Sequence, residues 1–516
     1  MPEIAPSFPF SGALAAGTIS LIVRNSPGDD RALLIVRLDQ PVFLAIKKRR
    51  SACLPRLRCG KTELPVMQLP PLSRRSFLKT ATIASAAASF PSVMRSQQGQ
   101  SANNKLNIAL IGVGGRGRAA VTGLKDENYV AFCDVDDVRA AQTYKEFPDV
   151  PHFRDYRQML DKLGRQIDAV TISTPDHMHF PIAVAALRMG KHVFVEKPMT
   201  HTVWEARELA KLAREKKVAT QMGNQGHASD GVRLLKEWVD AGVLGDVREV
   251  QSWTNRPLSH WPQGATNAKK PDHSKFIPVV PSTLDWELWQ GIAPERAYDP
   301  MYAPFTWRGF WDYGTGALGD MGCHLLDGVH WALQLDAPSQ IEAVSAFHNE
   351  LTGPSSSMIT FTFPARGKLA PMTLKWYDGG LIPPPPAEWD LKTPLPDNGT
   401  LIIGSKATVF ANLYYQSVRI IPEVKRQALA SSLPPRSLPR IEGGDHFKEW
   451  VRACKGGPAA GSNFDIASGL TELCLLSNVA VRARRPLTWD AAAMKVTNFP
   501  EANAYVSKPY RRGFGV

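Results

Sequence analysis

A glycine-rich turn between an apolar strand and a helix is the feature that most constrains the fold of this chain. Residues 106–111 form a short apolar run, typical of a buried parallel strand, and the sequence GVGGRG follows at 112–117. Between a strand and a helix, such a turn is typical of dinucleotide binding. Gly112 permits the tight turn, Gly114 lets the backbone approach a pyrophosphate, and Gly117 allows close helix–strand packing. The helix N-terminus then offers unpaired N–H groups to the phosphates.

An acidic residue ends the second predicted strand. Residues 129–133 form another apolar run, and Asp134 follows it at once. A carboxylate in this place accepts hydrogen bonds from both ribose hydroxyls of an adenosine and repels a 2′-phosphate. The sequence therefore favours NAD over NADP, with Asp136 as a nearby alternative for the same role.

Two further strand ends carry polar clusters. The run 167–172 leads into the segment STPDHMH at 173–179, and the run 192–195 leads into EKP at 196–198. Because open parallel sheets place ligands at the carboxyl ends of their strands, we expect both clusters to face the cofactor. The first half of the fold is therefore predicted to be α/β, with a doubly wound parallel sheet.

The second half combines a polar-faced helix with several strands. Residues 318–333 are helix-like, with Leu318 and Leu325 on an apolar stripe. Asp320 and His324 lie on the opposite side, one turn apart, so that both can reach one ligand. On periodicity alone, this polar face fits a solvated surface equally well. Strand-like runs at 341–347, 357–363 and 401–403 predict a substantial sheet.

The order and spacing of four motifs resemble the Gfo/Idh/MocA family (glucose–fructose oxidoreductase, inositol dehydrogenase and MocA). These motifs are the glycine-rich turn at 112–117, TP at 174–175 with His179, EKP at 196–198, and GALGDMGCH at 316–324. The resemblance covers residues 105–516, and the C-terminal stretch is similar to the secreted bacterial branch of the family. It implies a Rossmann domain over residues 105–225. It also implies a substrate and oligomerisation domain over 226–516 with an open, mostly antiparallel sheet.

The resemblance also implies roles for individual residues. Lys197 is expected beside the nicotinamide and the substrate, and Glu196 holds a ribose or positions Lys197. Pro198 is expected to follow a cis peptide bond. The residues expected to bind the cofactor are Gly112, Gly114, Gly115, Arg116, Gly117, Asp134, Thr174, Pro175, His179, Glu196 and Lys197.

The oxidation of a secondary alcohol requires a base in contact with the hydroxyl group. An unperturbed histidine titrates near neutral pH, so we assign His324 as the leading general acid/base. Lys197 is its partner, which polarises the oxygen or relays the proton, and the reverse sharing of the two roles stays open. Asp320 is expected to orient the hydroxyl group and His324.

Tryptophan residues are concentrated around Asp320 and His324, because residues 253–331 hold 7 of the 13 tryptophans. Aromatic rings stack well on the apolar faces of sugars, so some of them are expected to wall a substrate pocket. Arg308, Trp311 and Tyr313 are predicted to contact the substrate. His227 is a further candidate, because it follows a predicted strand end.

These observations support three functional hypotheses. The first is an NAD-dependent oxidoreductase that acts by hydride transfer on a secondary hydroxyl of a sugar, cyclitol or glycoside. The second is an NAD-dependent glycoside hydrolase that oxidises its substrate transiently and retains the cofactor. The third is a non-catalytic protein that binds a sugar or a nucleotide, against which the presence of Lys197, Asp320 and His324 together argues.

A basic leader precedes these domains at residues 1–104. The sequence SRRSFLK at 73–79 and the run of small, mildly apolar residues at 80–88 resemble a twin-arginine export signal, over about 67–90. We therefore expect recognition by the twin-arginine machinery and a periplasmic or secreted protein without stable membrane insertion. Residues 1–66 are expected to be an overextended start, with Met67 as the natural one, and residues 89–104 a linker.

Charge and cysteine usage exclude other classes. Residues 1–100 contribute +9 of the net charge of +13, so that only +4 remains for the rest of the chain. The balance therefore gives no argument for a nucleic-acid surface. The six cysteines lack CxxC spacing and the histidines lack paired ligand spacing, so no metal site is expected. An exposed open sheet favours a homo-oligomer.

Overall fold

The computed structural model describes the backbone of two N-terminal strands, together with residues 105–264, 272, 274 and 278–515. The chain divides into two compact units, Met1–Ser92 and Val93–Val516. In the first unit, β1 (Ile19–Arg24) pairs with β2 (Leu33–Leu38) in an antiparallel hairpin. The predicted export signal at about 67–90 lies outside the described residues.

The second unit begins with a six-stranded parallel sheet in the order β5-β4-β3-β6-β7-β8. Its strands are β3 (Asn107–Ile111), β4 (Asn128–Cys133), β5 (His152–Phe153), β6 (Ala169–Ile172), β7 (His192–Val195) and β8 (Thr220–Met222). In the order of the sequence, β4 and β5 are added on one side of β3, and β6, β7 and β8 are then added on its other side. The predicted doubly wound sheet is confirmed, and its switch point between β3 and β6 is where such sheets bind ligands.

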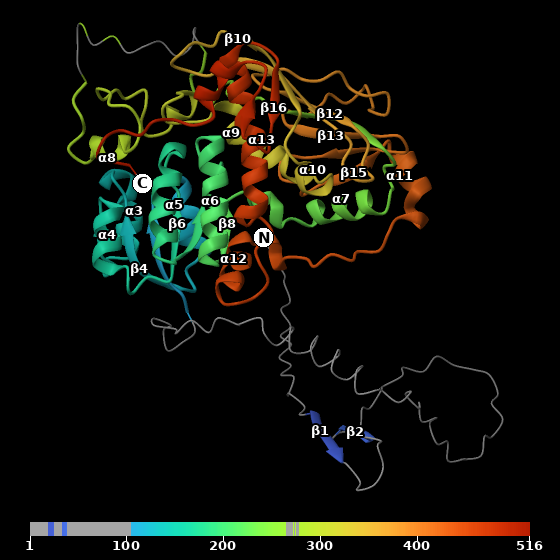
Figure 1. Cartoon of the computed structure of the whole chain (residues 1–516), viewed down its shortest axis with the longest axis horizontal. Coiled ribbons are helices and arrows are strands. Elements are labelled where there is room, and N and C mark those ends of the chain that lie inside the picture. The colour runs from blue at the N-terminus through green and yellow to red at the C-terminus, as the bar shows by residue number, and fades with distance from the viewer. Residues whose placement is uncertain are drawn as a thin grey trace, which may run out of the picture. The chain divides into compact units, whose positions relative to one another are not determined.

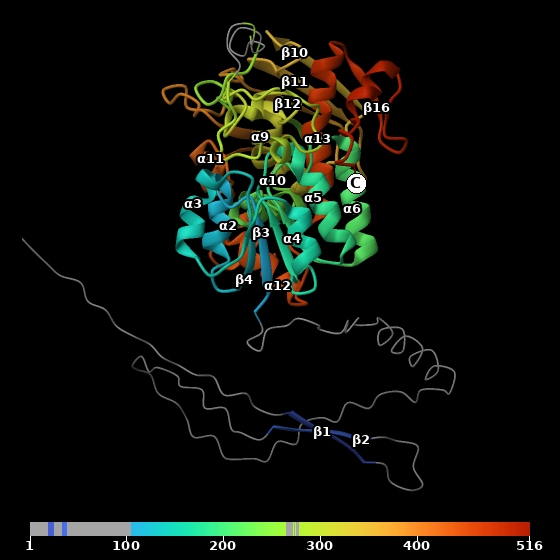
Figure 2. The same cartoon turned by 90° about the vertical axis from the view of Figure 1, so that its left-hand side faces the viewer.

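Helices cover both faces of this sheet (Figure 2). They are α2 (Arg118–Gly123), α3 (Asp137–Glu146), α4 (Tyr156–Leu163), α5 (Asp176–Arg188) and α6 (Val203–Lys216). Apolar residues of α2 and α3 pack in one buried cluster, whereas those of α4, α5 and α6 pack in another on the opposite face. The glycine-rich turn enters α2 through a short 3-10 turn at Gly115–Gly117.

A nine-stranded sheet forms the second layer, in the order β15-β14-β13-β9-β12-β11-β10-β16-β17. The strands are β9 (Val247–Trp253), β10 (Gln340–Ala346), β11 (Ser356–Phe363), β12 (Met372–Tyr377), β13 (Gly399–Gly404), β14 (Thr408–Ala411), β15 (Val418–Ile421), β16 (Leu487–Asp490) and β17 (Lys495–Val496). All neighbours are antiparallel except β9 and β12. The prediction of an open, mostly antiparallel sheet is confirmed.

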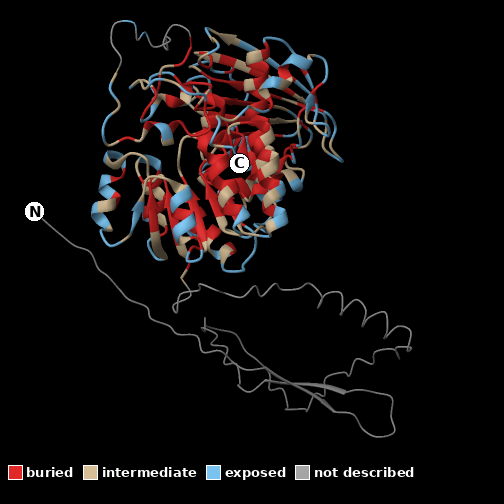
Figure 3. Cartoon of the chain, turned by 60° about the vertical axis from the view of Figure 1, so that its left-hand side comes forward, coloured by how far each residue is buried: buried red, intermediate tan, exposed pale blue. Residues whose placement is uncertain are grey.

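Four helices join the two sheets (Figures 1 and 3). These are α7 (Asp230–Asp240), α9 (Gly316–Leu325), α10 (Asp327–Ala332) and α13 (Phe464–Ala483). The structure interrupts the single helix predicted over 318–333 at Leu326, between α9 and α10. Among the described residues, α13 is the helix that is long and apolar enough to cross a membrane, but most of it is buried inside the protein. It is the core helix that contacts α6, α9 and β10.

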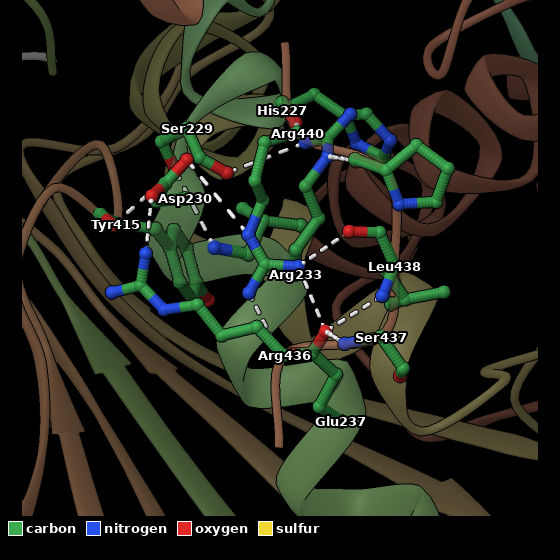
Figure 4. Close-up of polar contacts among 12 residues, drawn as sticks. His227, Ser229, Asp230, Arg233, Glu237, Tyr415, Arg436, Ser437, Leu438 and Arg440 are labelled. Atoms are coloured by element: carbon green, nitrogen blue, oxygen red, sulfur yellow. Dashed lines mark hydrogen bonds and ion pairs between the residues drawn. The ribbon is translucent and has the colours of Figure 1, made fainter. Parts of the chain in front are cut away.

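After β15 the chain runs toward the six-stranded sheet through α11 (Glu423–Leu429) and a loop that is hydrogen-bonded to α7 (Figure 4). The carboxylate of Glu237 on α7 accepts hydrogen bonds from the backbone N–H groups of Ser437 and Leu438 and from Arg440. Hydrogen bonding from Arg440 lowers the pKa of Glu237 to about 2. This anchor brings α12 (His446–Cys454) onto the cluster that covers α2 and α3.

A buried carboxyl group joins β11 to β12. Asp378 accepts hydrogen bonds from the Ser357 hydroxyl at 2.8 Å and from the Trp376 indole N–H at 2.9 Å. Burial raises the pKa of Asp378 to about 6, against these hydrogen bonds, which favour the carboxylate. Because the folded value lies above the unfolded value of 3.8, its favourable contribution is complete below about pH 4 and is lost as the pH rises through about 6.

We expect Asp378→Asn to flatten the pH dependence of stability, because the amide does not ionise. The melting temperature, measured between pH 4 and pH 7, should fall less in the variant than in the wild type, although the variant is less stable at pH 4. Asp161→Asn, at an exposed position, is the control and should keep the wild-type slope. A wild-type slope in Asp378→Asn would contradict the raised pKa.

Candidate active site

The main cavity, with a volume of about 490 Å³, opens at the carboxyl ends of the parallel strands. It is bounded by the glycine-rich turn, the ends of β4, β6 and β7, α9, and the segment around Pro304. The predicted site residues that line it are Gly112, Gly114, Gly115, Arg116, Asp134, Thr174, Pro175, Glu196, Lys197, Arg308 and Asp320. The structure thus brings together residues from both halves of the fold.

At its glycine positions, the glycine-rich turn leaves no room for a side chain. Gly112 has a φ of +76°, and a Cβ atom on it would lie 2.6 Å from the Ser173 carbonyl oxygen. A Cβ atom on Gly117 would lie 1.8 Å from the Gly112 carbonyl oxygen, although Gly117 itself lies behind the cavity wall. This close packing forms the narrow cradle of backbone that a pyrophosphate needs, so these residues fit a dinucleotide.

Asp134 fastens the turn from the end of β4. Its carboxylate accepts hydrogen bonds from the N–H groups of Val113 at 2.9 Å, Gly114 at 3.3 Å and Asp136 at 3.1 Å. Burial raises the pKa of Asp134, and these three backbone donors oppose the rise. Asp134 therefore shapes the turn and also presents its charge to the cavity, whereas Asp136 caps α3 by accepting from the N–H groups of Val138 and Arg139.

A partly buried ion pair joins the two halves of the fold at the wall of the cavity. The Lys197 ammonium, after β7, donates hydrogen bonds to Asp320 Oδ1 at 2.7 Å and to the Asp320 carbonyl oxygen at 2.9 Å. Arg308 Nε lies 3.3 Å from the same Oδ1, and its guanidinium stacks on the rings of Phe305 and Trp307. Burial opposes the charge on Asp320, but Lys197 and Arg308 outweigh it and lower the pKa of this carboxyl group.

His324 lies one turn beyond Asp320 on α9 but does not line the main cavity. It is buried, its ring meets the ring of Tyr414 edge-on at 5.0 Å, and its Nδ1 has no hydrogen-bond partner among the described residues. Burial, helped by the charge of Lys197, holds the pKa of His324 well below its usual range. The expectation of an unperturbed histidine at the substrate is therefore not matched, because every residue of α9 except Asp320 is buried.

His179 and Glu196 hold the loops of the cavity in place. The two ring nitrogens of His179 lie 2.8 Å from the Pro198 carbonyl oxygen and 2.9 Å from the Thr174 carbonyl oxygen. His179 thus lies behind the wall and ties two strand-end loops together, rather than lining the pocket as expected. Glu196 accepts a hydrogen bond from Arg116 Nε at 2.8 Å, and the Lys197–Pro198 peptide bond is cis, as predicted.

Asp176 is a site residue that the sequence analysis missed. It lines the cavity at the start of α5, and its Oδ2 accepts hydrogen bonds from the Thr315 hydroxyl at 2.6 Å and the Thr315 N–H at 3.1 Å. Burial raises the pKa of Asp176 to about 6. Its place in the segment STPDHMH was visible in the sequence, but its partner lies 139 residues away.

Three predicted substrate contacts lie outside the main cavity. Tyr313 is fully buried among aromatic rings, and Trp311 donates a hydrogen bond to the Asn349 carbonyl oxygen at 3.1 Å. His227, labelled in Figure 4, is 2% exposed, and its Nδ1 lies 2.8 Å from Asp327 Oδ1. Tyr313 packs against His177 of the first half, His227 pairs with Asp327 within the second half, and Trp311 lines a smaller second cavity, none of which the sequence alone revealed.

No group of histidine, cysteine and acidic side chains in the described part of the chain has the arrangement of a metal site. Cys133, Cys323, Cys454 and Cys474 are free thiols there.

Family models match both halves of this fold. Residues 106–224 match the NAD-binding Rossmann-fold model of the Gfo/Idh/MocA oxidoreductase family, and residues 230–365 match the model of its C-terminal α/β domain. The two matches are consecutive and cover the strands and helices that form the cavity. They support the assignment of this part of the chain to that oxidoreductase family, as its motifs had indicated.

Relatives with assigned names are similar over part of their length. A levoglucosan dehydrogenase of Pseudarthrobacter phenanthrenivorans is 26% identical over 188 residues, which are 36% of this chain and 38% of that protein. A glycosyl hydrolase family 109 protein of Shewanella amazonensis is 30% identical over 205 residues, 34% of this chain and 44% of that protein. The chain thus spans less than half the length of either relative.

Solved structures agree with this fold. The WlbA dehydrogenase of Bordetella pertussis, in complex with NADH and UDP-GlcNAcA, superimposes with a TM-score of 0.53 at 15% identity, over 75% of this chain and 99% of that one. At this identity the likeness shows the fold alone.

We expect Gly117→Ala to weaken dinucleotide binding in a folded protein, because the new methyl group would push the Gly112 carbonyl out of the turn. Titration of the protein with NADH, followed by fluorescence, should show a loss of affinity of roughly tenfold or more, which is about 1.4 kcal/mol. Gly515→Ala, where a Cβ atom meets nothing within 4 Å, is the matched control. Equal NADH affinity in both variants would contradict the proposed cradle.

Proposed function

We propose that this chain is an NAD-dependent oxidoreductase that transfers a hydride to or from a secondary hydroxyl carbon of a sugar, cyclitol or glycoside. The observation that carries the proposal is the Lys197–Asp320 pair at the inner end of a cavity whose other wall is a dinucleotide turn. The sugar dehydrogenase among its relatives supports this substrate class. Pro175, Thr174 and Glu196 lie on the same wall, where they would hold the cofactor.

Lys197 is placed to act on the substrate oxygen. An ammonium group has three N–H donors, and two of them are used by Asp320. The third is available to a hydroxyl or carbonyl oxygen in the cavity, where it would stabilise developing negative charge. In the reductive direction the ammonium would give this proton to the oxygen, and in the oxidative direction Lys197 would act as the neutral amine that accepts the hydroxyl proton. Bound NAD supplies the hydride acceptor in this scheme. Asp320 fixes the direction of the ammonium group, and Arg308 holds Asp320 from the other side.

His324 takes a different role from the one assigned on the sequence. Because its pKa is lowered by burial and it does not line the cavity, we propose Lys197 as the group that contacts the oxygen and transfers the proton, and His324 as a buried neighbour of the Lys197–Asp320 pair. The acid/base role, which the sequence left open between these two residues, is thereby given to Lys197.

A redox-neutral glycosidase is the second candidate, favoured by the glycosyl hydrolase relative. Incubation of the purified protein with free sugars, cyclitols and aryl glycosides separates the two. Net NADH accumulation supports the oxidoreductase, whereas release of the aglycone at constant NADH supports the glycosidase. If neither occurs although the protein binds NADH and a sugar, it is the non-catalytic binding protein, and the proposal fails.

We expect Lys197→Met to lower turnover by about 10²–10⁴, the usual contribution of a proton-transferring group, while NADH affinity changes little. Lys211→Met, an exposed lysine on α6, is the control and should keep wild-type turnover. Steady-state kinetics on the substrate found above measure both. A larger loss in His324→Asn than in Lys197→Met would return the proton transfer to His324.

We propose NAD rather than NADP as the cofactor, because the Asp134 carboxylate would repel a 2′-phosphate. Arg139 is the opposing feature, since its guanidinium lies over Gly115 in the same part of the cavity. We expect Asp134→Asn to raise the ratio of NADPH affinity to NADH affinity, because it removes the repulsion and leaves Arg139 in place. Fluorescence titration with both cofactors measures the ratio, and an unchanged ratio would show that Asp134 does not discriminate.

Two further proposals concern the cellular location and the oligomeric state of the protein. From the sequence SRRSFLK we propose export by the twin-arginine machinery to the periplasm or the medium, which cell fractionation tests. From the open nine-stranded sheet we propose a homo-oligomer, which light scattering of the purified protein tests.

A further inference from the structure

We propose that a second cavity, separate from the one described above, binds a small hydroxy-carboxylate. It has a volume of about 230 Å³ and shares no lining residue with the main cavity. It lies between α13, the loop 201–203 before α6, the segment 311–315 before α9, and the C-terminal segment 504–509. Its size suits a small ligand, because pockets for drug-sized molecules begin at about 300 Å³.

Arg482 on α13 is the first observation for this site. It lines the cavity, and its guanidinium stacks on the Tyr505 ring at 4.0 Å and lies 5.6 Å from the Trp311 ring. No hydrogen bond or ion pair joins it to another residue in the described part of the chain. Burial lowers the pKa of Arg482, with Tyr505 and Asp312 opposing. Stacking occupies the face of the guanidinium and leaves the N–H groups on its edge for a ligand.

Lys508 supplies a second cation on the wall. Its ammonium donates a hydrogen bond to His201 Nδ1 at 2.6 Å and lies 3.7 Å from Glu205 Oε1. His201 is neutral, because burial and the charge of Lys508 lower its pKa, and its Nε2 donates to the Gly314 carbonyl oxygen. The fully buried Glu205 is already shared, since it also accepts hydrogen bonds from two backbone N–H groups and from Tyr510.

The acidic residues on the wall do not cancel these charges. Asp312 forms an ion pair with Arg296, and Glu350 is exposed. Arg482 is partly buried and has no ion-pair partner among the described residues, whereas Lys508 keeps its contact with Glu205, so that Arg482 is the cation on this wall that a ligand would pair with. A carboxylate matches the fork of an arginine by two parallel hydrogen bonds.

The rest of the wall favours a ligand that also carries hydroxyl groups. Thr202, Asn478 and Ser507 line the cavity with polar side chains. The Thr202 hydroxyl accepts a hydrogen bond from the Glu205 N–H and Asn478 Nδ2 donates to the Thr315 carbonyl oxygen, so that the Thr202 O–H and Asn478 Oδ1 are the groups left for a ligand. Polar groups at several points around one charged anchor would fix the orientation of a polyhydroxylated acid. The ligand class that these residues fit is thus a small hydroxy-carboxylate, such as a sugar acid.

Isothermal titration of the full chain with D-gluconate, at saturating NADH, tests the proposal. We expect saturable binding that Arg482→Gln weakens roughly tenfold or more, since hydrogen bonds to charged groups contribute about 1.5–3 kcal/mol. Arg485→Gln is the matched control, because Arg485 also stacks on a ring, that of Phe499 at 4.0 Å, but lines neither cavity. It should bind D-gluconate within about twofold of the wild type.

Two comparisons make the result specific. D-glucose, which lacks the carboxylate, should not displace D-gluconate, and Lys508→Gln should weaken binding as well. NADH affinity and the melting temperature show whether each variant is folded, and Arg482→Lys retains the charge without the fork and should bind more weakly than the wild type. The proposal is overturned if D-gluconate does not bind, if Arg482→Gln binds it as tightly as the wild type, or if inorganic phosphate binds more tightly than D-gluconate at the same residues.

Discussion

The ion pair between Lys197 and Asp320 is the contact that joins the two halves of the fold at the main cavity. It joins the end of β7 in the parallel sheet to α9, which belongs to the half that carries the nine-stranded sheet. Burying two charges is costly, and only close geometry with further hydrogen bonds offsets the cost. Arg308 and the Asp320 carbonyl supply those hydrogen bonds. The pair thereby connects the end of β7 to α9 across the wall of the cavity.

Close backbone packing sets the other end of the cavity. The turn at 112–117 packs against the loop after β6. Asp134, at the end of β4, accepts hydrogen bonds from two backbone N–H groups of this turn. A second system of buried polar contacts, in which Glu237 and Arg440 anchor the returning chain, brings α12 onto the first sheet. The two halves therefore share one interior, and residues far apart in the sequence take part in each wall.

Burial also changes the chemistry of individual groups. His324 and Asp176 lie near the same ion pair, yet burial lowers the pKa of the histidine and raises that of the aspartate. In both cases the neutral form is favoured, because a low-dielectric interior disfavours charge of either sign. Lys197 and Arg308, by contrast, form ion pairs with Asp320 at the wall of the cavity.

The sequence by itself determined the order of strands and helices, the glycine turn and the residues at strand ends, because these follow from short-range periodicity and from backbone sterics. Lys197 and Asp320 were singled out because each lies in a local motif that resembles the Gfo/Idh/MocA family. Only the tertiary structure decided which polar faces are buried, so that His227 and Tyr313 became packing residues and Asp176 joined the site. The physical reason is that burial and partner choice depend on contacts between segments more than a hundred residues apart, which no local pattern records.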